Sequence, residues 1–335
     1  MRKLFTLFLL VILSPVLQAQ EVNIYSAREE NLIKPILDRF SAESGIKVNL
    51  ITGGADELTT RIEREGVNSP ADVLLTVDVG RLHRAKEQGL LRTIDSDLLE
   101  QRIPAHYRDS ENQWFAMSLR SRVIMYSKER VNPADLSTYA ALADPRWLGK
   151  VCVRSSSNIY NQSLVASMIS HQGVEATEAW ARGLVANFGR EPQGGDRDQI
   201  SAIVAGQCDL ALVNTYYLAG MLASTTGDDR NTALQVGVFW PDQMGNGAHV
   251  NVSGAGVTAN APNAEAAVRL LEFLVNDESQ AWYGEANNEF PVRTDINVSE
   301  TLRSWGTFKA DSIALEELGI HNAEAVRLMD RAGWK

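Results

Sequence analysis

Apolar positions follow two different periods along the chain and predict alternating strands and helices. A short apolar run at 22–25 is followed by apolar residues at helical spacing over 32–40. Gly45 is expected to end that helix, because glycine readily adopts the left-handed conformation found after many helices. The next apolar run, 47–51, predicts a second strand.

The same rhythm continues as far as residue 91. We expect a helix over 56–65, a buried strand in the run "ADVLLTVD" (71–78), and a helix in "GRLHRAKEQGLL" (80–91) that Gly89 closes. Strands that alternate with helices in this way are typical of a parallel sheet covered by helices on both faces.

A longer strand and a second α/β region follow. Residues 114–128 form a run long enough to cross between two lobes, and the turn-rich stretch 132–150 leads into the second lobe. The elements predicted there are strands at 150–154 and 209–214, helices from 159, over 174–187 and over 200–204, a strand pair in 249–260, and a mainly helical tail from 264.

We therefore predict two α/β lobes joined by crossing hinge strands, with a ligand cleft between them. The N-terminal lobe is expected to comprise residues 21–120 and about 246–293, and the C-terminal lobe residues 121–245 and about 294–335.

Residues 1–20 are predicted to be a secretory signal peptide. Arg2 and Lys3 precede the apolar segment 4–13, Ser14-Pro15 breaks any helix, and Ala19 offers a small residue for cleavage. The apolar segment is too short to span a membrane. The sequence therefore indicates export, to a periplasm or the cell exterior; an uncleaved amphipathic anchor is the alternative.

The charge of the chain limits its partners. The net charge of −10 becomes −12 without Arg2 and Lys3. So acidic a chain is a poor partner for nucleic acid or for an anionic membrane surface. We expect a monomer with no stable membrane insertion.

Cys152 and Cys208 each lie in an apolar run. In an exported protein, two cysteines are more often bonded to each other than free. A disulfide is possible if the two runs are neighbouring strands of one sheet. Two buried, reduced thiols are the alternative.

The strand predicted at 209–214 ends in an unusual way. A buried strand favours aliphatic residues, but this one runs into Asn214, Thr215, Tyr216 and Tyr217, at the edge where open α/β sheets bind ligands. Adjacent side chains of a strand point to opposite faces. The two phenols can therefore converge only if the chain leaves the strand at this point.

Several segments resemble the ferric-ion-binding proteins of bacterial ABC importers, which are type II periplasmic binding proteins of the transferrin-like superfamily. The combination of "SSSNIYNQS" with "NTYY" is the most specific resemblance, and the likeness extends over essentially the whole chain after the leader. The other segments are "ADVLLTVDVGRLHRAKEQGLL", "WFAMSLRSRVIMYSKERV", "ALADPRWLGKVCVRSSSNIYNQSLVASMI" and "HVNVSGAGV".

The resemblance implies a hinged periplasmic protein that binds Fe(III) and delivers it to an inner-membrane permease and its ATPase. It places Tyr160, Tyr216 and Tyr217 as phenolate ligands. The chemistry is consistent, because Fe(III) is a hard cation that prefers anionic oxygen. A phenol, with a pKa of about 10, is deprotonated at neutral pH only when a cation stabilises the phenolate.

The N-terminal segment departs from the family pattern. Where relatives place a histidine and a tyrosine as further ligands, this chain has Glu29 and Glu30, which either bind the metal or are solvated at a helix start. Tyr25 is expected in the core or at the hinge. Three tyrosines leave coordination positions open for water or a synergistic anion such as carbonate. Arg120 matches a family arginine that could pair with such an anion, and Arg28 is a weaker candidate.

Other functions have less support from the sequence. The five histidines share no metal-ligand spacing, and His249 is expected to be a core histidine with satisfied hydrogen bonds. There is no nucleophile elbow, P-loop or dinucleotide fingerprint, so we do not expect an enzyme. Two alternatives stay open, a binding protein for a small organic ligand or oxyanion and a ligand-sensing subunit, since both use the same open–closed equilibrium.

Overall fold

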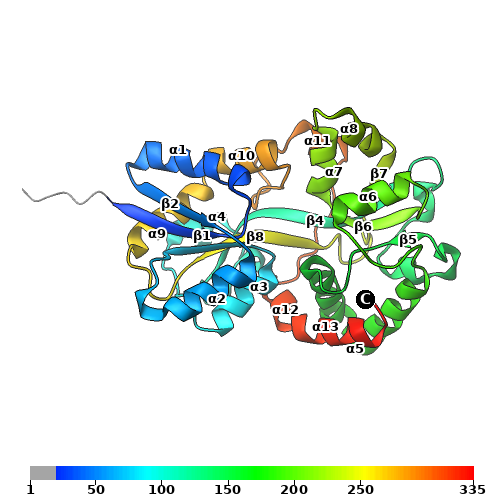
Figure 1. Cartoon of the computed structure of the whole chain (residues 1–335), viewed down its shortest axis with the longest axis horizontal. Coiled ribbons are helices and arrows are strands. Elements are labelled where there is room, and N and C mark those ends of the chain that lie inside the picture. Colours follow the sequence, from blue (N-terminus) through cyan, green and yellow to red (C-terminus); the bar gives the residue numbers. More distant parts are fainter. Residues whose placement is uncertain (1–19) are drawn as a thin grey trace, which may run out of the picture.

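The computed structural model describes residues 20–335, so the predicted signal peptide lies outside the described residues except for Gln20. Two lobes lie side by side, and the long strands β4 and β8 run from one into the other (Figure 1). The strands are β1 (Glu21–Ser26), β2 (Lys47–Thr52), β3 (Val73–Val77), β4 (Phe115–Ser127), β5 (Val151–Cys152), β6 (Leu210–Asn214), β7 (Val236–Phe239) and β8 (Val250–Val257).

In each lobe, helices cover both faces of the sheet (Figure 1). The α-helices are α1 (Lys34–Ser44), α2 (Ala55–Glu65), α3 (Val79–Glu87), α4 (Asp97–Arg102), α5 (Ile159–Ala186), α6 (Asp196–Val204), α7 (Thr215–Leu222), α8 (Gly227–Leu234), α9 (Ala264–Leu274), α10 (Asp277–Asn287), α11 (Glu300–Ser304), α12 (Glu316–Ile320) and α13 (Asn322–Arg331). The 3₁₀ turns are η1 (Glu30–Leu32), η2 (Gly66–Asn68), η3 (Ala105–Tyr107), η4 (Pro133–Asp135), η5 (Ala140–Ala143) and η6 (Pro145–Trp147).

Two glycines mark helix boundaries. Gly45 follows α1 with φ 71°, which confirms the predicted end of that helix. The helices predicted from 159 and over 174–187 form the two halves of α5, which Gly173, at φ 82°, separates by a kink.

The sheet is mixed rather than parallel. Strand order is β2-β1-β3-β8-β4-β6-β5, with β7 also paired to β4. The pairs β1/β2, β1/β3 and β5/β6 are parallel, whereas every pair that includes β4 or β8 is antiparallel. The prediction of a parallel sheet is thus wrong at the centre, because β4 carries the chain into the second lobe and β8 returns it in the opposite direction.

The strand pair predicted in 249–260 is a single strand, β8. The glycines of this strand do not form a turn. They allow the backbone of the adjacent segment 113–115 to pack closely against it. A Cβ at Gly254 would lie 2.8 Å from the Phe115 carbonyl oxygen, and one at Gly256 would lie 2.6 Å from the Gln113 carbonyl oxygen.

Each lobe has its own hydrophobic core. One large cluster joins β1, β3 and the first half of β4 to the helices around them, and two smaller clusters lie on the two sides of β4 and β6 in the other lobe. Tyr25 is fully buried in the large cluster, which confirms its assignment to the core, and its hydroxyl donates to the Glu65 carboxylate over 3.0 Å.

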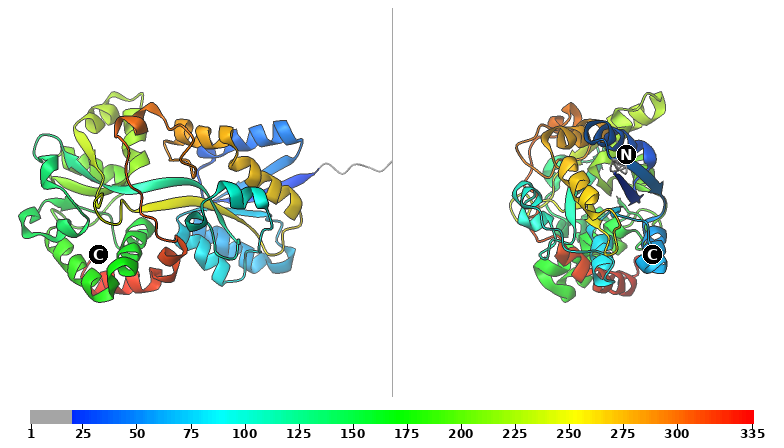
Figure 2. Two further views of the ribbon diagram at one scale, coloured as in Figure 1. Left: turned by 180° about the vertical axis from the view of Figure 1, so that it is seen from behind. Right: turned by 90° about the vertical axis from the view of Figure 1, so that its left-hand side faces the viewer.

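The C-terminal helices contact both lobes. Leu315 and Leu318, at α12, belong to the core cluster of the first lobe. Leu328 and Met329, on α13, belong to a cluster of the second lobe. The rear view shows these helices crossing the junction between the lobes (Figure 2).

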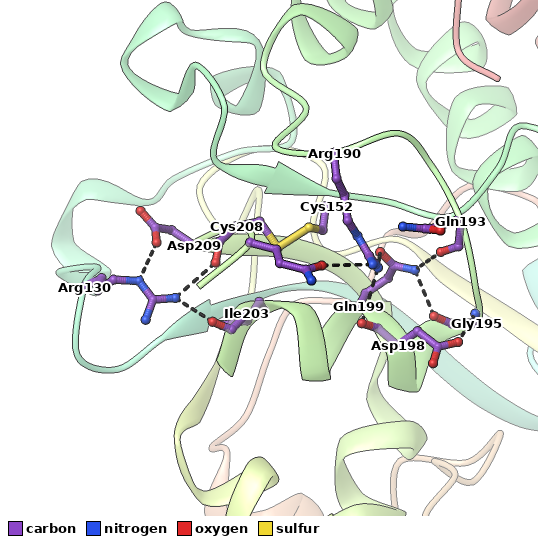
Figure 3. Close-up of a disulfide and its surroundings, with 11 residues drawn as sticks. Arg130, Cys152, Arg190, Gln193, Gly195, Asp198, Gln199, Ile203, Cys208 and Asp209 are labelled. Atoms are coloured by element: carbon purple, nitrogen blue, oxygen red, sulfur yellow. Dashed lines mark hydrogen bonds and ion pairs between the residues drawn. A yellow bond between two sulfur atoms is a disulfide. The ribbon is translucent and has the colours of Figure 1, made fainter. Parts of the chain in front are cut away.

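Cys152 and Cys208 form a disulfide, as predicted. Their Cα atoms are 5.8 Å apart, and both side chains are buried. The bridge lies where β5 pairs with β6 (Figure 3). Beside it, Arg130 donates to the Asp209 carboxylate and to the Cys208 carbonyl. Among the described residues, no helix is long and apolar enough to cross a membrane.

Candidate functional site

A cleft of about 520 Å³ lies between the lobes and is lined by residues of both. Its N-terminal wall comes from the segment between β1 and η1, from η1, β3 and β4, and from the end of α10 with the two residues after it. Its C-terminal wall comes from α5, α6 and α7. The lining residues are Ala27, Arg28, Glu29, Asn31, Leu32, Val77, Arg120, Tyr160, Arg197, Tyr216, Tyr217, Gly220, Ala286, Asn287, Asn288 and Glu289.

The three predicted tyrosines meet in this cleft. Tyr160 lies in the first turn of α5, and Tyr216 and Tyr217 lie in the first turn of α7, which follows β6 without a loop. The chain thus leaves the strand before the two phenols, as they require in order to converge. Tyr216 Oη donates to Tyr160 Oη over 3.3 Å, and the ring centroids of Tyr216 and Tyr217 are 4.3 Å apart.

The environment of these phenols favours their neutral form. Burial, together with the nearby Tyr160, raises the pKa of Tyr217 to about 12. Burial, with Tyr160 and Tyr217 beside it, raises the pKa of Tyr216 well above its ordinary value. Both groups are therefore neutral at physiological pH until a cation in the cleft stabilises the phenolate.

Arg120 has unused hydrogen-bonding capacity next to the tyrosines. It comes from β4, is only 2% exposed, and its Cζ lies 5.4 Å from the centroid of the Tyr160 ring. Nη1 donates to Ser253 Oγ over 3.0 Å, but Nε and Nη2 have no partner among the described residues. Buried donors without partners on the wall of a cleft are suited to a bound anion.

Arg28 is placed differently. It also lines the cleft, but its Nη1 donates to Glu289 Oε2 over 2.9 Å and to Ser253 Oγ over 2.7 Å. Burial opposes the charge of this guanidinium; the carboxylate of Glu289 outweighs that effect, so the pKa of Arg28 is raised. Arg28 is therefore already paired within the protein.

The two glutamates are not equivalent. Both are exposed, but Glu29 contributes to the wall of the cleft, whereas Glu30 begins η1 and is not among the lining residues. Of the pair, only Glu29 shares the cleft with the tyrosines.

A buried ion network behind the tyrosines was not predicted from the sequence. Asp196, at the start of α6, accepts from Arg154 over 2.6 Å and from Arg122 over 3.0 Å. Arg122 also donates to Asn161 Oδ1, in the same turn of α5 as Tyr160. In the sequence, only the position of Arg154, directly before "SSSNIY", places a member of this network near Tyr160. No local pattern around Asp196 indicates that it pairs with the two arginines.

Other cleft residues were missed as well. Arg197, Asn287, Asn288 and Glu289 line the cleft from α6 and from the end of α10. They lie in or directly after polar helical stretches whose pattern matches a solvated surface, so the sequence carried no signal for them.

The histidines are not arranged as a metal site. Within residues 20–335, no group of three or more His, Cys, Asp or Glu side chains could hold a metal ion. His249 is 2% exposed and lines a separate cavity of about 60 Å³, near His171 and Asp311. It is a core residue as expected, but the expectation that it is satisfied is wrong, because its Nδ1 has no partner among the described residues.

Two α/β lobes with a polar cleft beside the crossing strands define a two-lobed solute-binding protein. Residues 68–311 match the family model described as bacterial extracellular solute-binding protein, and the chain belongs to that family. It is 50% identical over 318 residues to iron uptake protein A1 of Synechocystis, covering 95% of this chain and 88% of that protein.

Solved structures have the same fold. The Trichodesmium protein IdiA (FutA) in complex with iron and citrate is 49% identical and superposes with a TM-score of 0.92, covering 94% of this chain and 100% of the other. Ferric iron-binding protein A of Mannheimia haemolytica in an open conformation is 44% identical, with a TM-score of 0.88 and coverage of 94% and 99%. The type II periplasmic-binding-protein fold is thus confirmed.

Proposed function

We propose that this protein binds Fe(III) in the cleft between its lobes and delivers it to an ABC importer. The convergence of Tyr160, Tyr216 and Tyr217 in one cleft carries the proposal, because clustered phenols are suited to a hard trivalent cation. The iron-binding relatives support it. The protein has no catalytic turnover in this role.

An anion completes the coordination of the metal. Three phenolates leave an octahedral ion with open positions, and the unpartnered donors of Arg120 lie beside Tyr160. Carbonate is one such anion. The Trichodesmium relative, which was solved with iron and citrate, supports a carboxylate in the same role. Glu29 is at most an additional ligand.

Transport follows from closure of the lobes. The C-terminal lobe, which includes residues 121–245, supplies the three phenolates and captures the ion first. The N-terminal lobe, residues 21–120 and about 246–293, closes over it by rotation about β4 and β8. A permease and its ATPase, acting at the inner membrane of a cell with a periplasm, then receive the ion from the closed protein.

An absorption titration tests the proposal. The metal-free protein is titrated with Fe(III) citrate in the visible range, beside a Tyr216→Phe/Tyr217→Phe double variant. We expect a broad phenolate-to-iron charge-transfer band that saturates near one equivalent in the wild type and is lost in the double variant. Tyr126→Phe is the matched control, since Tyr126 lies on β4 outside the cleft.

A colourless wild-type protein would rule out the tyrosine site. The organic-ligand alternative would then be examined by thermal-shift screening with small anions and polyamines. A band of undiminished strength in the double variant would place the iron on residues other than Tyr216 and Tyr217.

A further inference from the structure

Asp78 has an unusual backbone conformation for a residue that is not glycine. It connects the end of β3 to α3 with φ 81° and ψ 127°, a region that L residues rarely adopt. Such conformations persist only where surrounding contacts enforce them, and they are concentrated at functional sites. The contacts of the Asp78 side chain should therefore be the ones that enforce this conformation.

The Asp78 carboxylate is fully buried and bound by three different elements. Oδ1 accepts from the Gly80 amide over 2.9 Å, which caps α3. Oδ2 accepts from Asn251 Nδ2, on the crossing strand β8, over 2.8 Å. Ser163 Oγ, on α5, lies 2.8 Å from Oδ1 and 3.0 Å from Oδ2.

These contacts join the two lobes. Val79 and Leu82 of α3 belong to the core cluster of the first lobe, whereas Leu164 and Val165 of α5 belong to a cluster of the second. The hydrogen bond from Ser163 to Asp78 therefore crosses from one core to the other.

The contact is also close to the proposed ligands. Val77, the residue before Asp78, lines the cleft, and Ser163 lies one helical turn after Tyr160 on α5. The start of α3 packs directly against the start of α5, since a Cβ at Gly80 would lie 3.5 Å from Ile159 Cδ1. The carboxylate is thus buried behind the wall of the cleft, next to Val77.

We propose that Asp78 is a positioning residue that holds the first turn of α5, and with it Tyr160, against the N-terminal lobe. This proposal rests on the proposed Fe(III) function, for which it adds an interlobe hydrogen bond that slows the release of iron. The strained backbone at Asp78 aims the carboxylate across the boundary between the lobes.

The test removes only the interlobe bond. Ser163→Ala deletes the hydroxyl and leaves the cap of α3 and the bond to Asn251 in place. Thr177→Val is the matched control, because Thr177 is a buried residue of the same helix whose hydroxyl donates to the Gly173 carbonyl within α5. Both proteins are loaded with Fe(III) and mixed with excess EDTA, and the decay of the charge-transfer band is followed.

We expect Ser163→Ala to release iron about tenfold faster than the wild type, as the loss of one buried hydrogen bond predicts. Its absorption maximum and its stoichiometry should be unchanged, since all three phenols remain. Thr177→Val should release iron within about twofold of the wild-type rate. An unchanged rate in Ser163→Ala, or equal acceleration in both variants, would overturn the proposal.

A second readout does not need iron. Amide hydrogen exchange of the metal-free proteins reports on α3, which lies in the opposite lobe from Ser163. We expect faster exchange over 79–83 in Ser163→Ala and no change there in Thr177→Val. Unchanged exchange over 79–83 would overturn the interlobe contact even if the wild type failed to bind iron, so failure of the two proposals can be told apart.

Discussion

Arg154 and Asp196 form an ion pair directly behind the tyrosine cluster. Arg154 Nη1 lies 2.6 Å from Asp196 Oδ2, and the Cζ atom of the same guanidinium is 5.8 Å from the centroid of the Tyr160 ring. Because Asp196 also accepts from Arg122, one carboxylate pairs with two arginines and fixes the starts of α5 and α6 relative to β4.

Asp196→Asn should be strongly destabilising. The substitution leaves Arg122, which is 1% exposed, without its counter-ion, and breaking a buried pair in this way costs about 3–5 kcal/mol. Urea unfolding gives the free energy. Asp38→Asn is the control, because Asp38 pairs with Lys34 at the surface and its loss should cost below about 1 kcal/mol. Equal losses in the two variants would contradict the role of Asp196.

His249 should make the folded protein sensitive to acid. Burial lowers the pKa of His249 to about 4, whereas the unfolded chain has the ordinary value of about 6.5. Between these values the unfolded chain binds the additional proton, so stability falls as pH falls from 6.5 to 4, by about 3 kcal/mol in total. His249→Gln should flatten this part of the pH–stability profile, and His321→Gln, at a more exposed histidine, should not.

The disulfide should contribute measurably to stability. Cys152 and Cys208 are 56 residues apart, and in the chain-entropy model a loop of that length stabilises the fold by about 4 kcal/mol. A Cys152→Ala/Cys208→Ala variant should show a lower urea midpoint than the oxidised wild type. Addition of dithiothreitol should lower the midpoint of the wild type toward that of the variant and leave the variant unchanged.

Binding of iron should release protons and weaken in acid. Tyr216 and Tyr217 have raised pKa values, so both phenols are protonated before the metal binds. Each phenol must lose its proton to bind the metal, and the affinity for iron therefore falls as pH decreases. In a pH-stat titration, Tyr217→Phe should release one proton fewer per iron bound than the wild type. Equal proton release would mean that Tyr217 is not a phenolate ligand.

Glu29→Gln and Glu30→Gln should both keep the charge-transfer band at its wild-type position. Both side chains are exposed, which favours solvated carboxylates over metal ligands. Glu29 is the sharper test because it lines the cleft. A shifted band in Glu29→Gln alone would identify it as a ligand, with Glu30→Gln as the matched control.

Local patterns predicted most of the elements but not how the strands pair. The helix that ends at Gly45 and the long strand over 114–128 follow from spacing within short windows. Strand direction does not, because it depends on where the chain returns. The central antiparallel pairing of β4 with β8 joins segments more than 100 residues apart, and no local signal encodes it.

The candidate site divides in the same way. Tyr216 and Tyr217 stood out because phenols are unusual at the end of a buried strand. Asp196 and Asp78 did not, since each is an ordinary helix-start aspartate in the sequence. Their importance comes from partners on other elements, Arg122 at one and Ser163 at the other.

The helices α12 and α13 complete the two cores from the last part of the chain. Leu318 fills a place in one core and Met329 in the other, so each lobe lacks part of its interior until the C-terminus is available. Neither half of the molecule can therefore reach its final packing during synthesis. The two lobes should mature together, late, and as one cooperative folding event, and removal of the last turns should leave both of them prone to aggregation.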